Sequence, residues 1–131
     1  MRASAAILIL FVVGGCSRSG PPYSPADALK TFRVESGFRI ESYASEPDIR
    51  SPVAMEFDQT GRVYVVEAPG YPLNMAAKAG RVILLEDANG DGRPDRRTEF
   101  ADTLTMPTGV MAWKKGVLIT DAPDVLYFEA T

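Results

Sequence analysis

The sequence predicts an all-β fold: an incomplete β-propeller, with about two blades of four-stranded antiparallel sheet, after a lipoprotein signal and a short helix. Three observations predict it: an apolar leader ending at the only cysteine, a series of short segments rich in Val, Ile, Leu and aromatic residues, and an internal repeat. We divide the 131 residues into a signal peptide at 1–15, a lipidated cysteine with a flexible tether at 16–25, and truncated N-terminal blades of a propeller at 26–131.

The leader has the layout of an exported lipoprotein. A basic residue precedes an apolar run over residues 5–13, and two glycines precede Cys16. The run is shorter than the ~20 residues that a membrane span requires, but it fits the apolar core of a secretory signal. The four residues that end at Cys16, VGGC, are similar to a bacterial lipobox, so Cys16 is the predicted lipidation site and the lipid bilayer a predicted partner. Ser17 favours the outer membrane, with the protein exported to the periplasmic face.

A tether and a helix are expected between the leader and the β region. Residues 17–25 are polar and rich in Pro and Gly, which is typical of an extended linker. A short helix is predicted over residues 26–32, because Ser24 suits the N-cap, Pro25 the first turn and Asp27 the positive end of the helix dipole. Short, apolar segments between Gly, Pro and Asp then indicate strands. The expected strands cover residues 38–43, 54–57, 63–67, 82–86, 98–101, 109–113, 117–120 and 125–128.

An internal repeat organises these strands. Each unit begins with a proline, continues through a hairpin to an acid-Ala-Pro step, and ends in a third strand. Pro52 and Pro107 lie 55 residues apart, and the acids Glu67 and Asp121 lie 54 apart. This is roughly the size of a propeller blade; the alternative is two unrelated hairpins with the same turn chemistry. Because two blades cannot close a ring, we expect the remaining blades downstream, so that the chain is a fragment of a longer protein or a truncated gene product.

Composition excludes several kinds of site within this chain. There is no histidine and only one cysteine, so a zinc site, a serine triad and a C-x-x-C-H haem attachment cannot form. The net charge is −3 and no cluster of Lys and Arg occurs, whereas nucleic-acid-binding proteins usually carry a basic field. We therefore exclude nucleic acid as a partner.

Residues 87–95 match the first nine positions of a calcium loop, with a glycine at position 6. The candidate Ca²⁺ ligands are Asp87, Asn89, Asp91, the carbonyl of Arg93, and Asp95. Position 12 is Thr98, where an EF-hand has glutamate, so the loop is not an EF-hand. The alternative is a solvated turn rich in Asp and Asn, since these residues favour turns without any metal.

Several segments share the order and spacing of a known bacterial family. They are SPADALKTFRV (24–34), GFRIE (37–41), ASEP (44–47), PVAMEFD (52–58), GRVYVVE (61–67), GYP (70–72), residues 81–95, FAD (100–102) and PTGV (107–110). Together they resemble the N-terminal region of membrane-bound dehydrogenases of Planctomycetes and Verrucomicrobia, whose propeller is related to quinoprotein glucose and sorbosone dehydrogenases. The resemblance implies that PQQ or haem c binds only in a longer parent protein, in which a C-x-x-C-H domain follows.

The resulting functional expectation is the N-terminal part of a lipid-anchored periplasmic propeller protein that resembles membrane-bound sugar or polyol dehydrogenases. The chain alone is expected to be inactive, and no catalytic residue is assigned. Glu67, Tyr71 and Asp121 are candidates for binding a carbohydrate substrate, because they lie in or beside loops that follow inner strands, with Tyr71 able to stack on a sugar ring. The alternative for the two acids is that they cap strand ends by accepting backbone N–H bonds. The alternative function is a non-catalytic propeller that binds a glycan or a protein.

Overall fold

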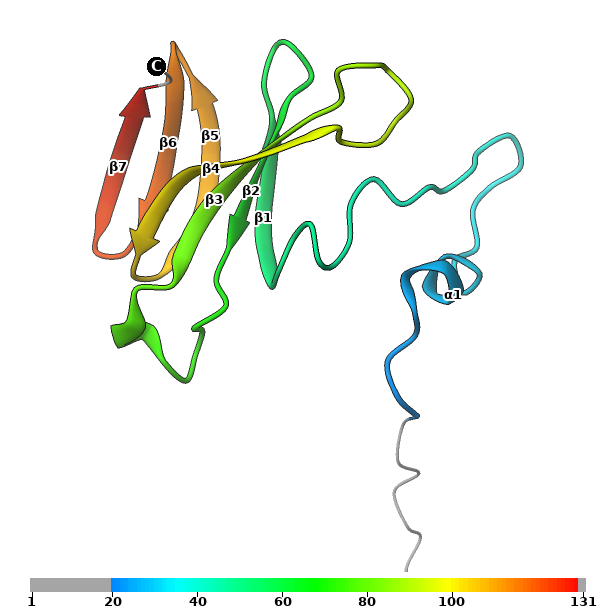
Figure 1. The fold of residues 1–131 in the computed structure, drawn as a ribbon, viewed down its shortest axis with the longest axis horizontal. Helices are drawn as coiled ribbons and strands as arrows, with labels where there is room; N and C mark the ends of the chain where they lie inside the picture. The colour runs from blue at the N-terminus through cyan, green and yellow to red at the C-terminus, as the bar shows by residue number, and fades with distance from the viewer. Residues whose placement is uncertain (1–19, 130–131) are drawn as a thin grey trace, which may run out of the picture.

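The computed structural model describes residues 20–129, which form two antiparallel sheets lying side by side (Figure 1). The first sheet has the order β1-β2-β3-β4 and the second the order β5-β6-β7. The strands are β1 (Pro52–Phe57), β2 (Val63–Glu67), β3 (Gly80–Glu86), β4 (Arg96–Leu104), β5 (Pro107–Trp113), β6 (Gly116–Asp121) and β7 (Asp124–Glu129). One short helix, α1 (Pro25–Leu29), precedes them, and a 3-10 turn, η1 (Met75–Ala77), lies between β2 and β3. The all-β, incomplete-propeller prediction is confirmed.

The two sheets are built alike, as the repeat predicts. Each is a meander of consecutive antiparallel strands, and each first strand begins with a proline, where a missing N–H does least harm to the ladder. Each first strand is also irregular directly after that proline, between Pro52 and Ala54 in β1 and between Pro107 and Gly109 in β5. Within the described residues the second sheet has three strands rather than four, so β7 has no strand on its outer edge there.

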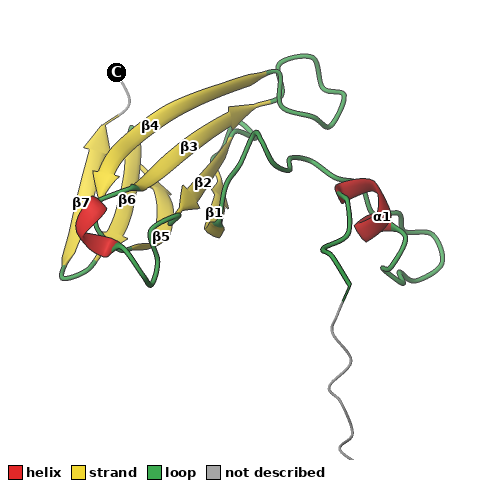
Figure 2. Ribbon diagram, turned by 60° about the horizontal axis from the view of Figure 1, so that its bottom comes forward, coloured by secondary structure: helices red, strands yellow, loops and turns green. Residues whose placement is uncertain are grey.

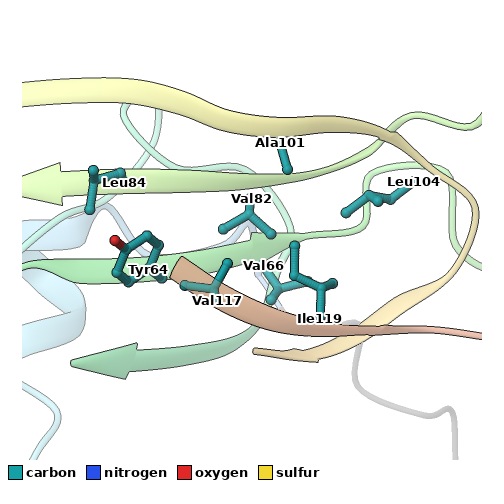
Figure 3. Packing of buried hydrophobic residues seen from close by; sticks show 8 residues of the cluster. All are labelled: Tyr64, Val66, Val82, Leu84, Ala101, Leu104, Val117 and Ile119. Carbon is teal, nitrogen blue, oxygen red and sulfur yellow. The ribbon is translucent and has the colours of Figure 1, made fainter. Parts of the chain in front are cut away.

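The main core lies between the two sheets. Side chains alternate between the faces of a strand, so every second residue of β2, β3 and β6 points into this interface. Figure 3 shows these side chains meeting across it. The buried members are Tyr64, Val66, Val82, Leu84, Ala101, Leu104, Val117 and Ile119. The first strands β1 and β5 lie next to each other, as inner strands of neighbouring blades do around a propeller axis.

A segment that precedes the sheets covers the opposite face of the first sheet. Four residues of β2 and β3 are buried there, and Tyr43, Ala44 and Ile49 pack against them. The four are Val63, Val65, Ile83 and Leu85. An apolar groove remains between this face and the residues in and around α1. The N-terminal segment therefore covers part of a surface on which, in a closed ring, another blade would pack.

Two local expectations were wrong. Residues 38–43 form no strand: Phe38 is 76% exposed, and no strand among residues 20–129 pairs with this segment. The helix ends at Leu29 rather than at residue 32. The chain tightens there because the N–H of Thr31 bonds to the carbonyl of Ala28, three residues back, and its hydroxyl bonds to the same oxygen. The N-cap was predicted correctly, since Ser24 Oγ accepts the N–H of Asp27 at 3.1 Å. Figure 2 shows α1 set apart from the strands.

Candidate functional site at the loop end of the sheets

Glu67, a predicted substrate-binding residue, ends β2 and is fully buried. Its carboxylate accepts the backbone N–H of Arg50 at 2.6 Å and pairs with the guanidinium of Arg81, which lies opposite it on β3. Arg81 is 27% exposed and also contacts Glu99 on β4. The pairing raises the pKa of Arg81, chiefly through its hydrogen bond to Glu67. The carboxylate thus ties the segment that leads into β1 to the ends of β2 and β3.

Asp121 occupies the matching place in the second sheet. It ends β6 and accepts the backbone N–H groups of Thr105 and Met106, the first of them at 3.0 Å. Those two residues lead into β5, as Arg50 leads into β1. We call this repeated arrangement, with its buried acid at the end of the second strand, the carboxylate clamp. Both acids therefore hold backbone within their own sheet, and their oxygens are engaged there.

Tyr71, the third predicted binding residue, lies in the β2–β3 loop and is 62% exposed. Tyr71, Glu67 and Asp121 do not line the three main pockets of residues 20–129. The loop around it is tightly closed, since Asn74 donates its N–H to the carbonyl of Gly70 at 2.7 Å. A side chain at Gly70 would place its Cβ 2.6 Å from the Asn74 carbonyl oxygen, so this turn requires glycine.

A polar pocket of about 480 Å³ opens between this loop and the ends of β3 and β4. The charged and amide side chains that line it are those of Arg50, Asn74, Lys78, Arg81, Glu99 and Asp102. Within residues 20–129, Arg50 and Lys78 form no ion pair. Glu67 does not line the pocket, but its ion pair holds the side chain of Arg81, which does. The pocket therefore offers free hydrogen-bond donors and acceptors at one end of the first sheet.

The sequence analysis missed these pocket residues. Arg81 had a usable signal: it is the first charged residue of the third strand, and antiparallel pairing places it opposite Glu67, where opposite charges attract. Lys78 and Asp102 had none, because they belong to a loop and to the far end of β4, whose approach depends on the tertiary fold.

The predicted calcium loop connects β3 to β4 and is held by its own hydrogen bonds. Asp87 accepts N–H bonds from Gly90 and Gly92, at 2.7 and 2.8 Å, and Asp95 accepts those of Ala88 and Asn89. The Asn89 amide nitrogen lies 3.3 Å from an oxygen of Asp91 and 3.0 Å from one of Asp95, and so occupies the space between these two carboxylates.

The arrangement of the predicted ligands shows how far this loop resembles a cation site. Across residues 20–129, no three Asp, Glu, Cys or His side chains converge as a metal ion would require. The backbone N–H of Arg93, whose carbonyl is the fifth predicted ligand, donates to one oxygen of Asp91 at 2.9 Å. Calcium binding stays a prediction, and a calcium titration that follows the amide signals of residues 87–95 tests it.

The hydrogen bonds of Asp87 predict a titration at low pH. The N–H of Gly92 above all lowers the pKa of this carboxyl from its ordinary value of 3.8, with smaller contributions from Gly90 and Asp91. A carboxyl whose pKa is lowered by folding keeps these bonds above its unfolded pKa and loses them as pH falls through the folded value. We expect the Gly92 amide resonance in NMR spectra to shift with a midpoint below 3.8. Asp87→Asn should abolish this titration, whereas a midpoint at or above the ordinary value would contradict the hydrogen bonding.

Two predictions about the leader concern residues outside those described. The signal peptide at 1–15 and the lipidation site Cys16 belong to the part of the chain before residue 20. Between residues 20 and 129, no helix combines the length and the apolar character needed to cross a bilayer.

Comparison with known proteins assigns most of the chain to one family. Residues 24–131 match the model of a family described as "Domain of unknown function (DUF7133)". No curated protein matches the chain, and no solved structure does.

Proposed function

The chain belongs to the DUF7133 family. We propose that it forms the opening blades of an exported, lipid-anchored propeller, which binds a carbohydrate at the end of the sheets where the β2–β3 loop lies. The parent protein of this proposal resembles membrane-bound sugar or polyol dehydrogenases, with Cys16 as the lipid attachment site. Haem c would attach in another part of that longer protein, because this chain has no histidine and only one cysteine. The resemblance implies that PQQ and the catalytic base also belong there.

The observation that carries the proposal is the polar pocket beside the β2–β3 loop. Its volume of about 480 Å³ lies within the usual range for small-molecule sites, about 300–1,000 Å³. Sugar hydroxyls both donate and accept hydrogen bonds, and the pocket offers partners of both kinds: Lys78 and Asn74 donate, while Asp102 accepts. A hydroxyl-rich ligand therefore suits this lining better than an apolar ligand does.

Binding without turnover is the second candidate function, and the carboxylate clamps favour it. Glu67 and Asp121 are the only buried acids of the described chain, and both are engaged by backbone N–H groups. A general base needs a free acceptor within reach of the substrate proton. Neither acid offers one, so neither Glu67 nor Asp121 is placed to act as a general base, and this favours recognition of a ligand without turnover.

One experiment separates the two functions. The protein is purified as its source cell makes it, and sugars and polyols are tested both for reduction of an artificial electron acceptor and for binding by calorimetry. Reduction by any of these compounds supports the dehydrogenase. Binding without reduction supports the lipoprotein that recognises a glycan. If the protein neither reduces the acceptor nor binds any of these compounds, the carbohydrate proposal as a whole is contradicted.

Pocket variants should weaken carbohydrate binding selectively. Removing a hydrogen bond to a charged group costs about 1.5–3 kcal/mol when the group is well shielded. Because Lys78 and Asp102 are exposed, we expect the lower end of that range or less, about a fivefold to tenfold loss of affinity for Lys78→Ala or Asp102→Asn. Lys30→Ala, which removes a surface lysine of the helix region, is the matched control. Equal affinity in all three variants would place the ligand elsewhere.

A further inference from the structure

The outer face of the second sheet is apolar and exposed. It consists of the residues of β5, β6 and β7 that point away from the first sheet: Met111, Trp113, Leu118, Val125 and Tyr127. Val125 is 66% exposed, and the rings of Trp113 and Tyr127 stack edge to face at 5.7 Å. Met, Trp and Tyr are residue types that protein interfaces favour. We call this surface the β5–β7 outer face.

The repeat shows what covers the equivalent surface elsewhere in the molecule. In the first sheet Tyr64 pairs with Leu84 across β2 and β3, and in the second sheet Leu118 pairs with Tyr127 across β6 and β7. Tyr64 and Leu84 are 2% and 7% exposed, because the second sheet packs on them. At the matching positions, Tyr127 is 42% exposed.

The next pair along the strands repeats this contrast. Val66 pairs with Val82 in the first sheet, and Thr120 pairs with Val125 in the second. Val82 is 0% exposed and Val125 is 66% exposed. At these positions of β6 and β7, the β5–β7 outer face therefore matches the face of the first sheet that the second sheet buries.

The other side of that interface defines the chemistry of the missing partner. The second sheet covers the first with a row of aliphatic and aromatic side chains, those of Val117, Ile119, Leu126 and Phe128. A partner with this pattern would bury Val125 and Tyr127 as the second sheet buries Val82 and Leu84. The edge of β3 is paired by β4 of its own sheet, whereas the equivalent edge of β7 has no neighbouring strand within the described residues.

We infer that the β5–β7 outer face docks a third sheet module of the same repeat, carried by the same polypeptide. The inference rests on the propeller of the proposed function and on the repeated interface between the sheets, and it does not depend on carbohydrate binding. Modules therefore add in one direction. The first sheet presents one face to the second sheet, and the second sheet presents its equivalent face to the third.

Hydroxyl-radical footprinting with mass spectrometry tests this inference on native side chains. We expect Trp113 and Tyr127 to be oxidised at least fivefold more slowly in the protein purified as its source cell makes it than in the isolated 131-residue chain. Tyr71, which is 62% exposed and lies in the β2–β3 loop, is the control and should be oxidised at the same rate in both. Equal oxidation of Trp113 and Tyr127 in the two samples would overturn the inference. Protection that grows with concentration in the isolated chain would also overturn it, because a second copy would then be the occupant.

A substitution distinguishes a docking face from an ordinary surface. Val125→Asp should shift the unfolding midpoint of the isolated chain by less than about 2 °C, since surface substitutions have small effects. In the protein as the cell makes it, the same change should lower the midpoint by more than about 5 °C, because the aspartate would lie in an apolar interface. Small shifts in both proteins would contradict the inference.

Discussion

Replacing Tyr64 with alanine is expected to lower the free energy of unfolding by about 3–5 kcal/mol, the range for truncating a large buried aromatic side chain. Tyr64 is 2% exposed and lies in the core between the two sheets. Its ring and that of Phe100 pack edge to face with their centroids 5.2 Å apart, so the substitution removes an aromatic pair as well as buried area. Urea unfolding followed by circular dichroism measures the loss.

Tyr64→Phe is the matched control for this prediction. It keeps the ring and removes only the hydroxyl, which accepts a long bond of 3.3 Å from Arg62. We expect it to cost less than about 1 kcal/mol, in keeping with the modest net contribution of one hydrogen bond. If Tyr64→Ala cost no more than Tyr64→Phe, the ring would not lie in the core described above.

Glu67→Ala should lower the free energy of unfolding by about 2–4 kcal/mol. Removing one partner of a buried ion pair typically costs about 3–5 kcal/mol, because it leaves an uncompensated charge behind. The expected value is smaller, since Arg81 is partly exposed and retains Glu99. The substitution also leaves the N–H of Arg50 without its acceptor. Chemical unfolding of the variant beside the wild type gives the difference.

The paired variants Glu67→Gln and Asp121→Asn show whether the clamps are structural. Both keep the shape of the side chain and an acceptor oxygen but remove the charge, so we expect a smaller loss of stability than alanine causes, with carbohydrate affinity little changed. A variant that kept full stability but lost affinity would instead support the original interpretation of these acids as binding residues.

The sequence predicted the parts of the fold that short-range patterns determine. The hairpin turns and the strand cores follow from alternating apolar residues between Gly and Asp turns, so β2 and β6 lie where they were expected. The repeat predicted that Pro52 and Pro107 would begin equivalent strands, which they do. The cap at Ser24 was equally visible, because an N-cap bond spans only three residues.

The features that the sequence did not predict depend on contacts between distant segments. Residues 38–43 have a strand-like composition, yet a strand also needs a partner, and none is present for them in the described structure. Tyr43 packs on the first sheet with its hydroxyl oxygen buried and without a hydrogen-bond partner in the described chain. Nothing in the local sequence indicates that arrangement.

The candidate site divides in the same way. The repeat identified Glu67 and Asp121 as equivalent residues, but their hydrogen bonds to segments 15 to 17 residues earlier became visible only in the fold. Lys78 and Asp102 line the polar pocket through a tertiary approach that no motif encodes. Equivalence within a repeat can therefore be predicted from sequence more readily than the role of the equivalent residues.

Trp113 fluorescence provides the most direct test that the two sheets share one core. This residue is the only tryptophan of the chain and lies in β5 of the second sheet, whereas Tyr64 lies in the first. If the sheets pack face to face and unfold together, Tyr64→Ala must lower the denaturation midpoint reported by Trp113 as much as the midpoint reported by circular dichroism. A Trp113 transition that stays at the wild-type midpoint while the circular dichroism transition moves would show two independent sheets, and would contradict the arrangement of the blades.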